Sequence, residues 1–168
     1  YYNRKQLFSM NLQCVCASNL VILCYSLKTS GATHDALAWE VSDLYTQTKA
    51  GKLPKGYWIV GDDAYPNSES VCTTYSGRGL ELRKSNFNFY VSRMRCAIER
   101  CFGIFVLRWQ IFKRALLQEP ERVAEIVACC IRLHNICCEA RDRWLALHAC
   151  STASSSSSSL ANIDPSGS

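Results

Sequence analysis

The stretch Tyr57-Trp58-Ile59-Val60-Gly61-Asp62-Asp63-Ala64-Tyr65-Pro66 determines how the rest of the chain can be arranged. Its first four residues are aromatic or β-branched, which predicts a short buried strand, and Gly61 lets the backbone leave that strand. A carboxylate at the end of a buried strand is firmly held and poorly solvated, as suits a divalent-metal ligand or a general acid or base. Asp62 is therefore the leading candidate for a functional residue.

Ordinary turn chemistry offers a second interpretation of Asp62. An aspartate after a glycine at a strand end often accepts hydrogen bonds from nearby backbone amides and does nothing else. On this stretch alone the structural interpretation is the more common one, and only features elsewhere in the chain favour the functional one.

The composition is that of one ordinary globular domain. The chain has 168 residues, of which 48% are hydrophobic and 20% charged, so it can bury a sizeable core. The longest apolar run, near residues 19–27, is too short to span a bilayer. We expect a soluble, intracellular protein without a membrane partner. Because it starts at Tyr1 and not at Met, we also expect a fragment or a processed chain.

Eleven cysteines are present, but none of them forms a CxxC pair. We expect free, mostly buried thiols that act as small hydrophobic residues in a reducing compartment. A zinc site built on His134 with neighbouring cysteines is disfavoured, because a second ligand pair at metal-knuckle spacing is missing. The nearby thiols are Cys130, Cys137 and Cys138.

Positive charge gathers in residues 83–114, where eight basic residues stand against the single acid Glu99. Aromatic residues are interleaved with them, which indicates a polyanion partner, most simply DNA. A solvated helix face explains the charge about as well when the segment is considered alone. The candidate DNA-binding residues are Arg93, Arg95, Arg100, Arg108, Lys113 and Arg114.

The N-terminal half reads as strand, strand, helix, strand. Alternation predicts a strand over residues 7–16, a turn, and a second strand over 20–27, together an antiparallel hairpin. A helix should begin near Gly31 with Thr33 as its N-cap and end near Gly51. The strand before Asp62 follows, and this order predicts an α/β sheet with mixed pairing.

The C-terminal half reads as two long helices. Residues 67–86 should be a connecting loop, and a helix should follow over about 87–105. Residues 109–117 fit either a strand or a continuation of that helix. Pro120 should start the last helix, with Val123, Ile126, Val127, Cys130, Leu133 and Cys137 on its buried face. The serine-rich end should be disordered.

Glu99 also has two interpretations. It can pair with Arg95 one turn earlier, for about 0.2–0.5 kcal/mol, or it can be present because a metal ion or a proton requires it. Gly103, one turn later, would leave room on that helix face for a close neighbour or a phosphate backbone. His134 and Asn135 are expected to be structural groups inside a packed helix. Orienting Glu99 is their less favoured role.

Two segments resemble the DDE transposase domain of the PIF/Harbinger superfamily. They are Gly61–Pro66, and Arg95–Gly103 followed by Arg108-Trp109. Further ordered matches are Asn3-Arg4-Lys5 with Asn11-Leu12-Gln13, Gly31 with His34-Asp35, and Leu133–Cys137. The likeness runs in order from residue 2 to about residue 139, and several ordered motifs together are far more specific than any one of them.

The resemblance implies an RNase H-like mixed sheet flanked by helices, and a catalytic triad of two aspartates and one glutamate that holds Mg²⁺ or Mn²⁺. The second aspartate of the family corresponds to Asp62 and its glutamate to Glu99, both as catalytic and as metal-binding residues. Two such cations can activate a nucleophile and stabilise the leaving oxygen in phosphodiester displacement.

The chain also departs from the family pattern. No residue matches the first aspartate, since Tyr1 already stands too close to the Asn-Arg-Lys motif, and Asp35 would be a poor substitute. Val106 stands where the family usually has lysine, and Asp63 where it has a small residue. The usual N-terminal DNA-binding region is absent too.

These features predict a partial RNase H-like nuclease domain over residues 1–148, lacking its opening strand, and a disordered tail over 149–168. The Asp62 strand should then have one uncovered edge. By resemblance we expect a DNA endonuclease or transposase in the nucleus, inactive as this piece, with a separate DNA-binding protein as a further partner. The alternative is a catalytically dead, domesticated or relic transposase that binds DNA or protein.

Overall fold

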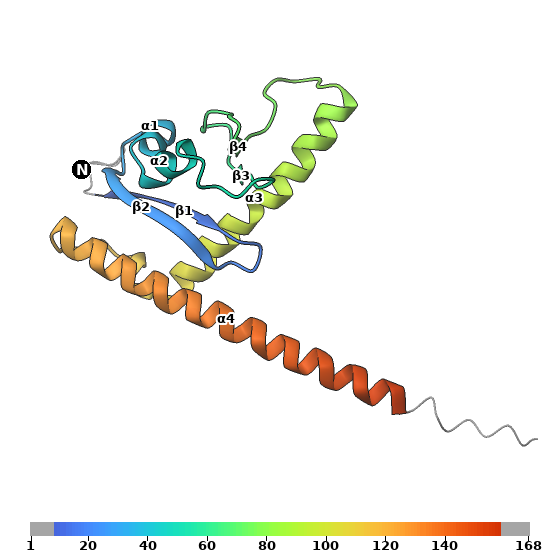
Figure 1. The fold of residues 1–168 in the computed structure, drawn as a ribbon. Coiled ribbons are helices and arrows are strands. Elements are labelled where there is room, and N and C mark those ends of the chain that lie inside the picture. The colour runs from blue at the N-terminus through green and yellow to red at the C-terminus, as the bar shows by residue number, and fades with distance from the viewer. Residues whose placement is uncertain (1–8, 159–168) are drawn as a thin grey trace, which may run out of the picture.

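The computed structural model describes the backbone of residues 9–158 and the side chains of residues 9–146. It is a mixed α/β arrangement of two small two-stranded sheets and two long helices (Figure 1). The elements are β1 (Met10–Cys16), β2 (Ile22–Ser30), α1 (Asp35–Glu40), α2 (Asp43–Lys49), β3 (Ile59–Val60), β4 (Val71–Cys72), α3 (Leu82–Arg108), the 3₁₀ helix η1 (Gln110–Lys113) and α4 (Pro120–Ser158).

β1 and β2 form the predicted antiparallel hairpin. The second strand runs three residues further than predicted, to Ser30. Residues 7 and 8 of the predicted first strand lie outside the described residues. The turn closes where the Ala17 amide donates to the Val21 carbonyl at 2.9 Å. Leu20 adopts a φ of 71° there, a left-handed conformation that is unfavourable for a residue with a Cβ.

The predicted helix after the hairpin is broken into α1 and α2. Val41 is the C-cap of the first. Ser42 is the N-cap of the second, because its buried hydroxyl accepts a hydrogen bond from the Tyr45 amide at 3.0 Å. The N-cap of α1 is His34 rather than the predicted Thr33. The side chains that α1 buries are Ala38 and Trp39, whereas Leu37 is 54% exposed.

The strand before Asp62 is present as β3 but is only two residues long. It is not the buried strand that was predicted, because Tyr57 and Trp58 are exposed and lie outside it, and Ile59 and Val60 are only partly buried. It pairs in parallel with β4, which lies inside the segment predicted to be a loop. The amides of Ile59 and Gly61 donate to carbonyls of the β4 segment at 2.9 and 3.0 Å. Within the described residues the two sheets share no strand pairing, so the other edge of β3 is uncovered, as the sequence predicts.

α3 is longer than predicted and packs against both β1 and β3. It buries Val91, Cys101 and Phe105, whereas Met94 is 55% exposed. The segment after α3 is neither of the predicted alternatives, since η1 makes one short 3₁₀ helix and the chain then runs without regular structure to Pro120.

α4 begins at Pro120 as predicted and runs to Ser158 (orange in Figure 1). Among its described side chains, α4 buries Val127, Ile131, His134 and Cys138. The predicted face is confirmed at Val127, and Val123 and Cys130 pack against the same core, but the prediction was wrong at Leu133 and Cys137, which are exposed. The first residues of the predicted disordered tail are helical, because extending an existing helix costs little compared with starting one. Residues 159–168 of that tail lie outside the described residues.

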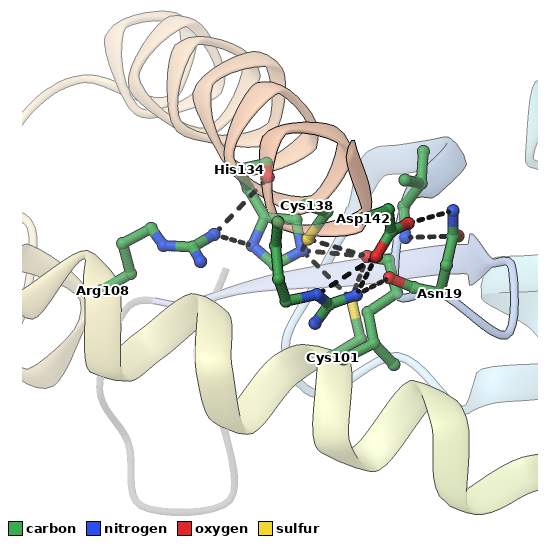
Figure 2. Close-up of polar contacts among 9 residues, drawn as sticks. Asn19, Cys101, Arg108, His134, Cys138 and Asp142 are labelled. Atoms are coloured by element: carbon green, nitrogen blue, oxygen red, sulfur yellow. Dashed lines mark hydrogen bonds and ion pairs between the residues drawn. The ribbon is translucent and has the colours of Figure 1, made fainter. Parts of the chain in front are cut away.

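The core joins the hairpin to the two long helices around the backbone carbonyl of Leu20. His134 Nε2 lies 2.9 Å from that oxygen, and the thiols of Cys101 and Cys138 donate to it at 3.4 and 3.8 Å. Arg108 Nη1 lies 3.0 Å from His134 Nδ1. Figure 2 shows this arrangement, which we call the Leu20 clamp, between α3 and α4.

Neighbouring residues of α4 extend the Leu20 clamp along the hairpin. The Asn135 side chain bonds both the amide and the carbonyl of Ile22 at 2.8 Å. Arg141 donates to the Asn19 carbonyl at 2.8 Å, and Asp142 accepts from the Asn19 side chain at 3.0 Å. The structural prediction for His134 and Asn135 is therefore supported, and neither of them contacts Glu99.

The ten described cysteines are all free, as predicted, but only Cys101 and Cys138 are buried and Cys96, Cys129 and Cys137 are exposed. Among the described residues, no cluster of three histidine, cysteine or acidic side chains could hold a metal ion. In the same part of the chain, no helix is long and apolar enough to cross a membrane.

Replacing His134 by alanine should destabilise the fold. The Leu20 carbonyl would keep only its two weaker thiol donors, and Arg108 would lose the ring nitrogen that it contacts. Poorly satisfied buried polar groups of this kind cost about 1–3 kcal/mol. Urea unfolding measures the loss, with Arg132→Ala on the exposed side of α4 as the matched control. Equal stability of the two variants would contradict the clamp.

The same histidine should make stability depend on pH. Burial lowers the pKa of His134, and the nearby charges of Arg108 and Arg141 lower it further. Below about pH 6.5, His134 is therefore protonated in the unfolded chain but stays neutral in the folded chain. The free energy of unfolding then falls as pH falls, by at most about 1.4 kcal/mol per pH unit. Urea unfolding between pH 7.5 and 5.5 should show this slope, and His134→Gln should flatten it.

Candidate active site

A groove of about 610 Å³ separates β1 from β3 and has α3 along one side. Both predicted carboxylates, Asp62 and Glu99, line this groove. They reach it from different elements, Asp62 from the end of β3 and Glu99 from the middle of α3. The two residues singled out 37 positions apart in the sequence thus face one hollow.

Asp62 sits directly after β3 because the chain turns there. Its Oδ1 accepts a hydrogen bond from the Ala64 amide at 3.0 Å, and its carbonyl accepts one from the Tyr65 amide at 3.2 Å. This is the turn chemistry of the simpler interpretation. It also fixes the carboxylate, and Oδ2 has no hydrogen-bond partner among the described residues. The turn and a ligand role are therefore compatible.

Glu99 forms an ion pair with Arg95 one turn earlier, at 2.6 Å. Both side chains are substantially exposed, so the pair stabilises the helix by only a few tenths of a kcal/mol. Such a weak pair holds Glu99 loosely and leaves it able to take another partner. No described residue outside its own helical turn comes close to Gly103, since a Cβ there would meet nothing within 4 Å. The predicted close protein neighbour is therefore wrong, and the alternative of a phosphate backbone stays a prediction.

Tyr65 is a neighbour that the sequence analysis did not single out. Burial raises its pKa to about 12, and the negative charges of Asp35 and Asp62 add to this effect. Its ring packs edge-on against Trp39. Asp35 in turn accepts a hydrogen bond from the Asn11 side chain at 3.0 Å. The Tyr65 hydroxyl therefore stays protonated at neutral pH.

The six predicted DNA-binding residues separate into three groups. Arg93, Arg95 and Arg100 line the groove beside the carboxylates, and the Arg93 guanidinium lies over the Phe89 ring. The Arg108 guanidinium contacts the buried ring of His134, so this arginine has a structural role in the core. The remaining two, Lys113 and Arg114, are exposed at and after η1 and line a different hollow, formed by residues 110–118.

The groove provides oxygen ligands of the kind that Mg²⁺ and Mn²⁺ prefer. Asp62 and Glu99 have the right chemistry, and Asp62 has the rigid support that a ligand needs. They are two ligands and not a complete set. Their position next to three arginines would let a polyanion and a cation occupy one hollow.

Comparison with known proteins identifies the family of the chain. A family model for the DDE superfamily endonuclease matches residues 1–135. The chain therefore belongs to the DDE superfamily endonuclease family, whose nucleases typically use divalent metals.

The relatives that match are longer than this chain. It is 28% identical over 152 residues to "Putative nuclease HARBI1" of Bos taurus and, equally, to that of Homo sapiens, covering 86% of this chain and 42% of each relative. It is 26% identical over 151 residues to "Protein ALP1-like" of Arabidopsis thaliana, covering 82% and 37%. The chain thus spans about two fifths of the length of these relatives. No solved structure is significantly similar to it.

Asp62 offers a test that separates its two interpretations. Asp62→Asn keeps an Oδ1 acceptor for the Ala64 amide, whereas Asp62→Ala removes it, so only the alanine variant should lose stability, by about 1 kcal/mol. Both variants should lose the carboxylate's contribution to Mn²⁺ binding. Thermal unfolding with and without Mn²⁺ measures both effects. Mn²⁺ stabilisation that persists in Asp62→Asn would remove this residue from the metal site.

Proposed function

We propose that this chain is part of a metal-dependent DNA endonuclease of the transposase type, which hydrolyses phosphodiester bonds and transfers strands. The observation that carries the proposal is that Asp62 and Glu99 line one groove together with three arginines. Membership of the endonuclease family supports it.

Each part of the groove has a task in this chemistry. Asp62 and Glu99 would hold Mg²⁺ or Mn²⁺, which when bound activates the attacking oxygen and offsets charge on the leaving one. Arg93 and Arg100 would contact backbone phosphates, with an affinity that falls as salt rises. Arg95 would exchange its contact with Glu99 for a phosphate when metal binds.

We infer further that the groove between β1 and β3 accepts one more strand, which would join the two sheets into the mixed sheet of an RNase H-like fold. Because the Ile59 and Gly61 amides face β4, the Val60 amide between them points to the opposite edge. Across the groove, Gln13 Oε1 is buried and lacks a partner among the described residues. A strand placed here could pair with both sides.

A third carboxylate on that strand would complete the set of metal ligands. The longer relatives have ample sequence outside the matched region to supply such a strand. We therefore propose that this chain by itself binds Mn²⁺ weakly and cleaves poorly, and that activity requires the added strand.

The second candidate function is a binding module without catalysis. It is favoured by the structural contacts that both carboxylates already make, Asp62 with a backbone amide and Glu99 with Arg95. Such a module would keep the basic residues and bind DNA, or another protein, without cutting.

DNA and a separate DNA-binding protein are the proposed partners, and the nucleus is the proposed location. The matching relatives come from mammals and a plant, in whose cells chromosomal DNA lies mainly in the nucleus. The basic groove residues would supply contacts to phosphate but little sequence preference, so recognition of a target would come from the partner.

The proposal is tested by following cleavage of duplex DNA during a Mn²⁺ titration. The chain is compared alone and with the proposed strand supplied as an added segment, as wild type, Asp62→Asn and Glu99→Gln. Asp63→Asn, at the exposed neighbouring residue, is the matched control. We expect cleavage only with the strand, a loss of at least about a hundredfold in the first two variants, and little change in the control.

Three other outcomes would contradict parts of the proposal. Cleavage that survives in Asp62→Asn would mean that the wrong carboxylate has been chosen. DNA binding without cleavage in the extended protein would favour the binding module, and failure to bind DNA at all would defeat both functions.

A further inference from the structure

Two exposed aromatic side chains lie side by side on the first turns of α3. Phe89 and Tyr90 are 56% and 63% exposed, and their ring centroids lie 5.5 Å apart at an interplanar angle of 78°. Rings at this angle do not cover each other face to face. The end of α3 that carries them (green in Figure 1) extends beyond the two sheets, so both rings offer apolar surface to solvent.

Positive charge surrounds the two rings. The Arg93 guanidinium lies over the Phe89 ring, 5.6 Å from its centroid, which is a cation–π contact. Over residues 75–95, five basic residues stand against the single acid Glu81. The surface around Phe89 and Tyr90 therefore combines apolar rings with the charge that attracts a polyanion.

The two rings adjoin the groove. Arg93 and Met94, one helical turn after Phe89 and Tyr90, line the groove together with Glu99. From residue 90 to residue 99 the helix rises by about 13 Å, which is the length of about four stacked nucleotides at roughly 3.4 Å each. A strand with a phosphate bound near Glu99 would therefore bring a base to the rings within a few nucleotides.

We propose that Phe89 and Tyr90 stack unpaired bases of a DNA strand whose backbone enters the groove, so that this site takes DNA that is partly single-stranded beside the bond to be cleaved. The inference rests on the proposed function, because it takes the groove to hold that bond. Aromatic rings beside a basic track suit single strands, since every base has a π-face. The bases of an intact duplex are stacked on one another and do not reach the rings.

A second aromatic pair on the same helix has a structural role and shows the contrast. The rings of Phe87 and Tyr75 lie 5.3 Å apart. The Asn88 side chain accepts a hydrogen bond from the Tyr75 amide and donates one to the Tyr75 carbonyl, both at 2.8 Å. These contacts fasten the loop before α3 to the helix. Within the described residues, the ring contacts of Phe89 are to Tyr90 and Arg93 of its own helix, so they fasten no other segment.

The test measures, by fluorescence anisotropy, the affinity of the full chain for a labelled thymine strand of about twelve nucleotides and for a blunt duplex of equal length. Phe89→Leu and Tyr90→Leu should each weaken single-strand binding by about five- to a hundredfold, because leucine is apolar but has no π-face. Duplex binding should change by less than about twofold. The single-strand loss should be equal at about 50 and about 200 mM salt, because the rings carry no charge.

Two further variants serve as controls. Phe89→Trp keeps a π-face and should retain single-strand affinity. Tyr25→Leu removes an exposed aromatic ring on β2 that does not line the groove, and it should change neither affinity. Thermal unfolding checks that each variant is folded, which we expect of the two substitutions on α3 because leucine favours a helix more than phenylalanine or tyrosine does.

The outcomes separate this inference from the nuclease function. Selective loss of single-strand binding in the leucine variants, with no cleavage by the extended protein, would support the stacking rings and defeat the nuclease. Cleavage by the extended protein, with single-strand affinity unchanged in folded Phe89→Leu and Tyr90→Leu, would overturn the stacking rings and leave the nuclease standing. Equal losses for single strand and duplex would also overturn the inference. So would leucine variants that alter self-association in the ultracentrifuge but not DNA affinity, since the rings would then serve a protein contact.

Discussion

The structure depends on one backbone carbonyl. Leu20 adopts a left-handed conformation, which costs a residue with a Cβ about 1–2 kcal/mol, and this turns its oxygen into the space between α3 and α4. A histidine and two thiols meet it there. Because these three side chains come from both long helices, the hairpin, α3 and α4 are fixed to one another at a single point. This contact also sets the shape of the groove, because it fixes the hairpin relative to α3, and β1 and α3 form two sides of the groove.

The candidate site is built from residues whose local contacts would look complete without any function. Asp62 closes a turn and Glu99 pairs with an arginine. Neither contact accounts for their common position in one basic groove. A turn fixes only the backbone near Asp62, and a pair four residues apart on a helix fixes only that helix. Their convergence arises from the packing of α3 against both sheets, which no local contact requires.

Local signals in the sequence were sufficient for the hairpin, the start of α4 at Pro120 and the strand that leads to Asp62. They were insufficient where a polar residue belongs to the core. Periodicity considers apolar side chains only, so it predicted Leu133 and Cys137 on the buried face of α4. The residue buried there is the polar His134, because its ring hydrogen-bonds the Leu20 carbonyl. β4 is two residues long and pairs through its backbone alone, which leaves no pattern to detect. The paired positions of Asp62 and Glu99 came from the family resemblance and not from spacing.

The length of α4 divides the molecule into parts that need not unfold together. Arg141 and Asp142 fasten the helix to Asn19, and past this contact its remaining turns extend away from the sheets (Figure 1). The backbone of those turns lies beside no other element in Figure 1, so their helical hydrogen bonds can open and reclose while the core stays intact. Amide hydrogens there should exchange with solvent faster the closer they lie to Ser158. Exchange should become slow where the helix reaches the turn of the hairpin. The end of α4 is thus a separate, weaker unit of stability that shares a helix with the strongest part of the core.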